Sequence, residues 1–228
     1  MARQQRSSAP TARRERAYHH RDLRNALIAA ALEALPDVGA ESLSLRDIAR
    51  RAGVSSAAPY HHFADRDALV AAVAGECAQR LLDALDAAVA EAGDDQLRRF
   101  QLTGVAFIRF AVTYPAHFRA MEMPGMLAKM PEPVRRRFDR FYREEERRMR
   151  EAQRLGLIAP VSFEALILAA TALVHGLAHL IINGSTRAAP DDVDHAVRLA
   201  REVTSVFGTG VLPRAALPAR KSHNNRHR

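Results

Sequence analysis

Five side chains that carry hydroxyl or imidazole groups are concentrated between Gly53 and Phe63. They are Ser55, Ser56, Tyr60, His61 and His62. Groups of these types hydrogen-bond to phosphate oxygens and to the edges of bases. A helix that served only for packing would carry leucines at some of these positions. The segment therefore favours a surface that contacts nucleic acid, although an ordinary helical hairpin has the same spacing.

The surrounding sequence has the pattern of two short helices joined by a tight turn. Apolar residues recur at helical spacing over residues 45–52, and Ser44 with Asp47 forms a capping-box pattern. Gly53 is expected to end the first helix with a positive φ, and a serine to cap the second. Pro59 then falls in the first turn of the second helix, where its missing N–H does little harm. This arrangement indicates a helix-turn-helix, whose second helix can enter the major groove of DNA.

The run from Leu45 to Leu69 resembles the DNA-binding domain of the tetracycline-repressor (TetR) family. The matching sequences are Ile48-Ala49, Ala52-Gly53-Val54-Ser55, Tyr60-His61-His62-Phe63 and Leu69. The resemblance implies a three-helix domain that binds double-stranded DNA. It implies contacts with base edges or nearby backbone for Arg46, Ser56, Ala57 and His61. It implies phosphate contacts for Ser44, Ser55, Tyr60, His62 and Arg66.

Composition limits the class of protein and its partners. The chain has 228 residues, a formal net charge of +8 and a pI near 10.6, which favour an anionic partner. The first 24 residues are polar and rich in arginine, without the apolar core of a secretory signal. Cys77 is the only cysteine, so no internal disulfide can form. These features predict a cytoplasmic protein.

The distribution of apolar residues predicts an all-α chain with four segments. We expect a disordered basic arm over residues 1–19 and the helix-turn-helix domain over 20–66. A helical regulatory and dimerisation domain should follow over 67–208, and a disordered basic tail over 209–228. The first helix is expected to run from about Arg21 to Val38, and residues 116–121 to form a turn. Gly75 lies inside the fourth helix, which predicts close packing against a neighbour.

The most apolar stretch runs from Phe163 to Ile182 and is long enough to suggest a membrane span. Glu164, His175 and Asn183 interrupt or follow it, so we favour a helix buried on two sides, with no membrane contact. Small residues follow one another on one side of this helix. We predict a homodimer interface formed by Ala165, Ala169, Ala172, Gly176, Val197 and Val203.

An irregular segment over residues 121–133 contains four methionines, whose soft side chains suit either the wall of an apolar ligand site or core filling. The predicted ligand-binding residues are Phe107, Phe110, Met121, Met126, Phe141, Tyr142 and His175. Val174-His175-Gly176 also resembles the ligand-binding domain named for a Trp-His-Gly signature, although this chain contains no tryptophan.

His175 and His179 have a spacing that can bind metal, but no third ligand accompanies them, so we favour structural roles. Neither a phosphate-binding glycine loop nor a nucleophile motif is present. We therefore predict no catalytic residue, cofactor or metal. The favoured hypothesis is a dimeric repressor that binds a pseudo-palindromic operator and is released by a small apolar effector. The alternative is a helical protein-interaction module without DNA binding.

Overall fold

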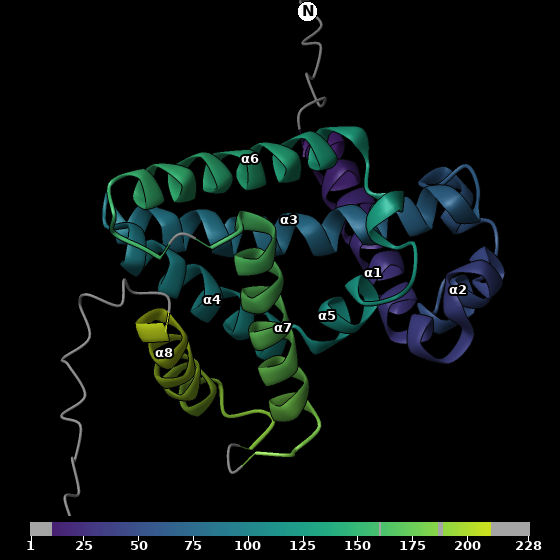
Figure 1. Ribbon diagram of the computed structural model, residues 1–228. Helices are drawn as coiled ribbons and strands as arrows, with labels where there is room; N and C mark the ends of the chain where they lie inside the picture. The colour runs from purple at the N-terminus through teal and green to yellow at the C-terminus, as the bar shows by residue number, and fades with distance from the viewer. Residues whose placement is uncertain (1–10, 160, 187–188, 211–228) are drawn as a thin grey trace, which may run out of the picture. The chain divides into compact units, whose positions relative to one another are not determined.

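The computed structural model describes residues 11–159, 161–186 and 189–210 (Figure 1). Within these residues the chain forms helices and no strand, which confirms the predicted all-α fold. The elements are α1 (Thr11–Ser42), α2 (Leu45–Arg51), the 3-10 helix η1 (Ala58–His61), α3 (Arg66–Ala92), α4 (Gln96–Thr113), α5 (Pro115–Met121), the 3-10 helix η2 (Leu127–Lys129), α6 (Glu132–Arg154), α7 (Phe163–Ile182) and α8 (Val193–Gly210).

The chain divides into two compact units. The first contains residues 1–79 and 116–135, and the second contains residues 80–115 and 136–228. Helices α3 and α6 therefore contribute residues to both units. The predicted boundary after residue 66 falls inside the first unit, because the first turns of α3 belong to it.

Two terminal predictions differ from the structure. Helix α1 begins at Thr11, so residues 11–19, which we predicted to be disordered, are helical. Near its other end, Gly39 has φ 73° and ψ 161°, which breaks the helical backbone beside the predicted end at Val38. At the C-terminus, α8 extends to Gly210. The remaining parts of the predicted arm and tail, residues 1–10 and 211–228, lie outside the described residues.

The core of the first unit is built from α1, α2 and the first turns of α3. Leu27, Ile48, Leu69 and Val73 are at most 1 % exposed. Gly75 confirms the predicted close packing, because a Cβ atom at this position would lie 3.0 Å from the Cδ of Pro131.

The segment after α4 differs from its predicted conformation. Residues 116–121, which we predicted to be a turn, belong to helix α5 of the first unit. Pro115 is the first residue of that helix, and proline is well suited to this position because its φ is already helical.

The second unit is organised around α4. Val105 and Ile108 on this helix pack with Leu177 and Ile181 on α7 and with Ala200 on α8. Helices α7 and α8 lie side by side in Figure 1, and these buried residues join them. The bounds of α7 are those predicted from the apolar run.

Candidate nucleic-acid interface and inner cavity

The polar side chains after Gly53 stand on a short element whose other side is buried. Pro59 and Phe63 are buried against the first unit's core. Tyr60, between them, is 52 % exposed, and His61 is exposed as well. Gly53 has φ 70°, as the turn was predicted to require. The buried proline and phenylalanine therefore fix an outward-facing polar surface.

The second element of the predicted helix-turn-helix is a 3-10 helix, η1, and not the α-helix that we expected. Its bonds connect residues three apart, as in Tyr60 N–H to the Ala57 carbonyl at 3.2 Å. Pro59 has no N–H, so it cannot donate an α-helical bond to the Ser55 carbonyl. The N–H of Ala58 donates to that carbonyl instead, at 3.0 Å. The missing donor therefore favours the tighter geometry.

The predicted side-chain caps do not form. Ser44 precedes α2 but makes no capping hydrogen bond, and Asp47 instead accepts from Arg50 Nη2 at 3.0 Å. Ala57 is the residue before η1, so neither neighbouring serine caps it. Because the serine hydroxyls are not used to cap these helices, they are available for hydrogen bonds to another molecule.

Most predicted DNA contacts lie at the surface. Six are exposed: Arg46, Ser55, Ser56, Ala57, Tyr60 and His61. Three are half-buried: Ser44, His62 and Arg66. The sequence interpretation missed Arg51, which is exposed at the end of α2 and has no ion-pair partner in the described part of the chain. The adjacent arginines at 50 and 51 were the available signal: both lie within helical reach of Asp47, three and four residues earlier, and in the structure Arg50 takes that partner.

Arg66 binds acceptors of its own chain. Its Nη1 donates to the Glu41 carbonyl at 2.5 Å, and its Nε and Nη2 donate to Asp67 at 2.9 and 2.8 Å. These bonds tie the end of α1 to the start of α3. The arrangement argues for a structural role of Arg66 and against the phosphate contact that the resemblance implied.

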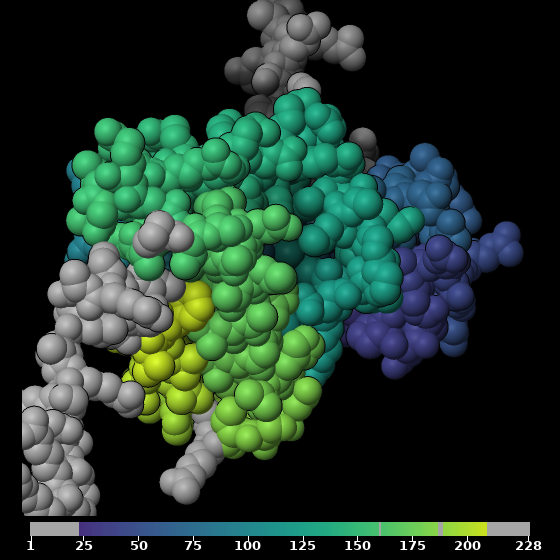
Figure 2. All heavy atoms as spheres, in the orientation of Figure 1, coloured from purple at the N-terminus to yellow at the C-terminus, as the bar shows by residue number. Residues whose placement is uncertain are grey.

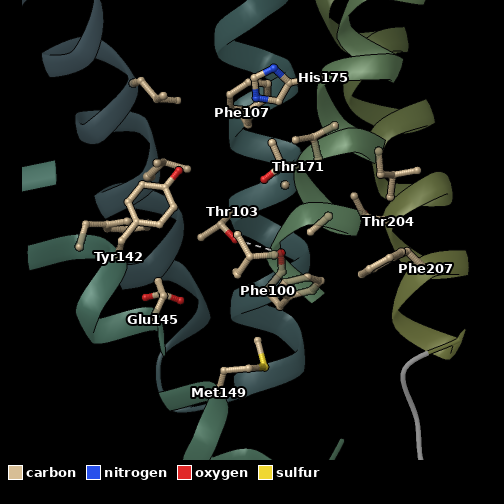
Figure 3. A pocket seen from close by; sticks show the side chains of 18 residues that line it. Phe100, Thr103, Phe107, Tyr142, Glu145, Met149, Thr171, His175, Thr204 and Phe207 are labelled. Atoms are coloured by element: carbon tan, nitrogen blue, oxygen red, sulfur yellow. Dashed lines mark hydrogen bonds between the residues drawn. The ribbon is translucent and has the colours of Figure 1, made fainter. Parts of the chain in front are cut away.

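The second unit contains a cavity of about 130 Å³ between α3, α4, α6, α7 and α8 (Figure 3). Phe107, Phe141, Tyr142 and His175, all predicted ligand contacts, line it. Its lining also includes residues that the sequence interpretation did not select. These are Leu81, Leu85, Phe100, Thr103, Gly104, Glu145, Met149, Ile167, Ala170, Thr171, Leu173, Val174, Thr204 and Phe207.

Three predicted ligand contacts do not line this cavity. Phe110 is only 2 % exposed and packs elsewhere in the second unit. Met121 and Met126 belong to the first unit, where Met126 is 1 % exposed. Met126 and Met130 are therefore core residues, as the alternative interpretation of the segment expected, whereas Met121 and Met123 are only half-buried.

Aromatic pairs form two parts of the cavity wall. The rings of Phe107 and His175 have centroids 4.6 Å apart, and those of Phe100 and Phe207 are stacked at 5.7 Å. His179, one turn after His175, is exposed. No cluster of three or more potential metal ligands is found among the described residues.

Helix α7 has an uncovered apolar face, which Figure 2 shows beside α8 on the viewed side. Leu168 is 67 % exposed and Leu180 is 50 % exposed. The small-residue stripe, which consists of Ala165, Ala169, Ala172 and Gly176, is exposed as well. Val197 and Val203 on α8 are half-buried against the core of their own unit. By length and composition α7 alone among the described helices could cross a membrane, and 28 % of its apolar window is buried.

Two family models match the chain. Residues 27–73 match the model described as bacterial regulatory proteins of the tetR family. Residues 100–204 match the model described as a tetracyclin repressor-like C-terminal domain. No curated protein matches the chain. The first match covers α2, η1 and their polar surface, and the second covers most of the cavity lining.

Several solved structures are similar over most of the chain. A protein of unknown function from Rhodococcus sp. RHA1 is 35 % identical, has a TM-score of 0.62, and is matched over 84 % of this chain and 96 % of its own. A TetR family transcription regulator from Marinobacter aquaeolei VT8 is 22 % identical, with a TM-score of 0.60 and coverage of 81 % and 97 %. The ketosteroid transcriptional regulator KstR2 of Mycobacterium tuberculosis is 17 % identical, with a TM-score of 0.60 and coverage of 83 % and 96 %. The last two show a shared fold. Taken with the family models, these matches show that the chain belongs to the TetR family of DNA-binding transcription regulators.

Proposed function

We propose that this regulator is a homodimeric repressor that binds a pseudo-palindromic operator and leaves it when a small apolar molecule occupies the second unit. The observation that carries the proposal is the exposed polar surface of η1, held by the buried Pro59 and Phe63. Arg46 and Arg51 on the neighbouring α2 add exposed positive charge. Phosphate contacts from such groups orient a protein on DNA, and base-edge contacts supply specificity.

Dimerisation is supported by the uncovered face of α7. One reading element covers only a few base pairs, so a twofold dimer is needed to place two of them one or more DNA turns apart. Exposed leucines beside a stripe of small residues allow a second helix to approach closely and bury apolar area. Gly176 fits this role, because an added Cβ atom would meet nothing within 4 Å in the single chain.

Release by a ligand requires that the ligand bind the DNA-competent and the released states with different affinity. The aromatic cavity is the candidate binding site in the described part of the chain. Helix α3 has residues in both compact units, so it is the candidate element for transmitting occupancy. We propose no catalytic role, and we expect a cytoplasmic location.

The proposal is tested by fluorescence anisotropy with DNA from the region upstream of the protein's own gene. Binding should weaken steeply as salt concentration rises, because phosphate neutralisation releases counterions. Tyr60→Phe should weaken binding to all sequences by a similar factor. If the purified protein ignores this DNA at low salt, the operator model fails and a role in protein interaction takes its place.

A further inference from the structure

We propose that the cavity of the second unit takes an uncharged single-ring molecule with one oxygen atom, which hydrogen-bonds to the hydroxyl of Tyr142 or of Thr171. This inference rests on the proposed ligand-dependent release and adds the chemical class of the ligand. It follows from three properties of the lining, namely its charges, its hydroxyl groups and its size.

The charge of the cavity wall is already compensated. Among the described residues that line the cavity, Glu145 is the only Asp, Glu, Lys or Arg, and His175 is the only other titratable side chain besides Tyr142. Its carboxylate accepts three short contacts from Arg99, with Nε at 2.9 and 3.2 Å and Nη2 at 2.5 Å. The two side chains are 17 % and 7 % exposed. The pair therefore contributes no net charge to the space that a ligand would occupy.

This compensation disfavours ligands of either charge. An anionic ligand would lose its hydration beside the carboxylate of Glu145 without meeting a lining lysine or arginine. A cationic ligand could bind that carboxylate only by competing with Arg99, and it would leave a guanidinium nearly buried without its partner. An uncharged ligand avoids both penalties.

Two of the lining hydroxyls are available to a ligand and two are used by the backbone. Thr103 donates to the Phe100 carbonyl at 3.0 Å, and Thr204 donates to the Ala200 carbonyl at 2.7 Å. By contrast, the hydroxyls of Tyr142 and Thr171 have no hydrogen-bond partner among the described residues. Figure 3 shows these two side chains on opposite sides of the cavity, on α6 and α7.

The state of the tyrosine suits this role. Tyr142 is 40 % exposed overall, and desolvation of its hydroxyl by the surrounding side chains raises the pKa of that group above its ordinary value of 10.0. The hydroxyl is therefore protonated at neutral pH and can donate to a carbonyl or hydroxyl oxygen of the ligand. On the other wall, the hydroxyl of Thr171 can likewise donate to a ligand oxygen or accept from it.

The size and shape of the cavity favour one ring. An apolar cavity of roughly 150 Å³ in another protein accommodates benzene, and this cavity is similar at about 130 Å³. Its aromatic walls, the pair Phe107–His175 and the pair Phe100–Phe207, offer flat surfaces against which a ring can pack. A six-membered ring with a short alkyl chain and one oxygen fits these limits.

The experiment is titration calorimetry of the full chain at pH 7 with four matched probes: 4-ethylphenol, ethylbenzene, 4-ethylbenzoate and 4-ethylbenzylamine. We expect 4-ethylphenol to bind at least about tenfold more tightly than either charged probe. At least one of Tyr142→Phe and Thr171→Val should weaken the binding of 4-ethylphenol by about three- to tenfold, and both should leave the binding of ethylbenzene unchanged. Tyr114→Phe, at the residue that follows α4 and outside the lining, is the control and should change neither affinity.

A charge-neutralising variant tests the role of Glu145 directly. Glu145→Gln keeps an acceptor for Arg99 but removes the compensating charge, so 4-ethylbenzoate should bind at least about tenfold more tightly than it binds the wild type. If this variant does not fold, the affinities of the four probes for the wild type are sufficient to test the proposed ligand class. The inference is overturned if 4-ethylbenzoate or 4-ethylbenzylamine binds the wild type as tightly as 4-ethylphenol does, or if no probe binds.

Operator binding, measured in parallel, distinguishes a failure of the proposed ligand class from a failure of the proposed repressor function. If the chain binds its operator and a charged probe releases it, only the ligand class is wrong. If 4-ethylphenol binds the cavity and the chain does not bind the operator, the ligand class stands and the proposed repressor function fails.

Discussion

Arg99 on α4 and Glu145 on α6 form a nearly buried ion pair that connects two helices of the second unit. Removing one partner leaves the other charge buried without compensation, so Glu145→Gln should lower the free energy of unfolding by about 3 kcal/mol. Replacing both with apolar residues of similar volume, Arg99→Met with Glu145→Leu, should recover most of that loss. Urea unfolding of Glu145→Gln, of the single variants Arg99→Met and Glu145→Leu, and of the double variant measures these differences.

The interaction energy in this mutant cycle should be large because the two side chains are in direct contact. A double variant whose loss equals the sum of the two single losses would show that the pair is not coupled. Arg98→Met, at an exposed position on the same helix, is the control and should cost less than about 1 kcal/mol.

Arg46 and Arg50 provide a matched pair on α2. Both are exposed, but Arg50 is held by Asp47 while Arg46 has no ion-pair partner among the described residues. Arg46→Ala should weaken DNA binding and reduce the slope of log K against log salt by about 1, because one phosphate contact is lost. Arg50→Ala should have a smaller effect. Equal slopes for Arg46→Ala and the wild type would exclude Arg46 as a phosphate contact.

Gly75 and Gly208 test whether packing overrides helix propensity. Alanine favours a helix over glycine by about 1 kcal/mol, so propensity alone predicts that both substitutions stabilise. Gly208→Ala meets nothing within 4 Å and should follow this prediction. Gly75→Ala places a Cβ atom 3.0 Å from the rigid ring of Pro131, and we expect a net loss of about 1 kcal/mol. Chemical denaturation of both variants decides the sign.

Ala172 lies in the small-residue stripe on the exposed face of α7. Ala172→Arg should leave the monomer folded and weaken dimerisation at least about tenfold, because two like charges would meet near a twofold axis. Ala90→Arg, at an exposed position on α3, is the matched control. Sedimentation equilibrium gives the dimerisation constant, and an unchanged constant for Ala172→Arg would place the interface elsewhere.

Glu144 should contribute a small stabilisation that depends on pH. Hydrogen bonds from Arg147 and Arg148 lower the pKa of its carboxyl from 4.5 to about 2. A group with a lowered folded-state pKa stabilises above its unfolded pKa, and the effect disappears as pH falls from about 4.5 towards 2. Because the pair is exposed to solvent, Glu144→Gln should cost less than about 1 kcal/mol at pH 7. Unfolding at pH 7 and pH 3 should show the difference between variant and wild type shrinking with acid.

Patterns that depend on one helix face or one backbone angle could be predicted from the sequence. The bounds of α7 follow from a continuous apolar run, and the positive φ of Gly53 follows from the need to turn the chain. The crowding at Gly75 was also predictable. Glycine lowers the stability of a helix relative to alanine, so its presence inside α3 indicates that a neighbour leaves no room for a Cβ atom.

Features that depend on tertiary partners could not be predicted in this way. Glu145 belongs to an alternating run of Arg and Glu that is typical of a solvated face. In the structure it is nearly buried and pairs with Arg99, which lies 46 residues earlier in the chain. The cavity collects side chains from five helices whose arrangement no local pattern specifies. The composition of the methionine segment favoured core filling over a ligand wall but did not exclude either, and the segment's placement in the first unit, with Met126 buried, agrees with core filling.

The exposure of Ser56 and Ala57 on a surface anchored by Pro59 and Phe63 has a consequence for divergence after gene duplication. Substitutions at exposed positions that make no fold-stabilising contacts usually change stability by no more than about 0.5 kcal/mol. A duplicated copy could therefore acquire new side chains at these two sites and recognise a different promoter while its fold stayed intact. Selection on promoter choice and selection on foldability would then act on separate residues of the same short segment.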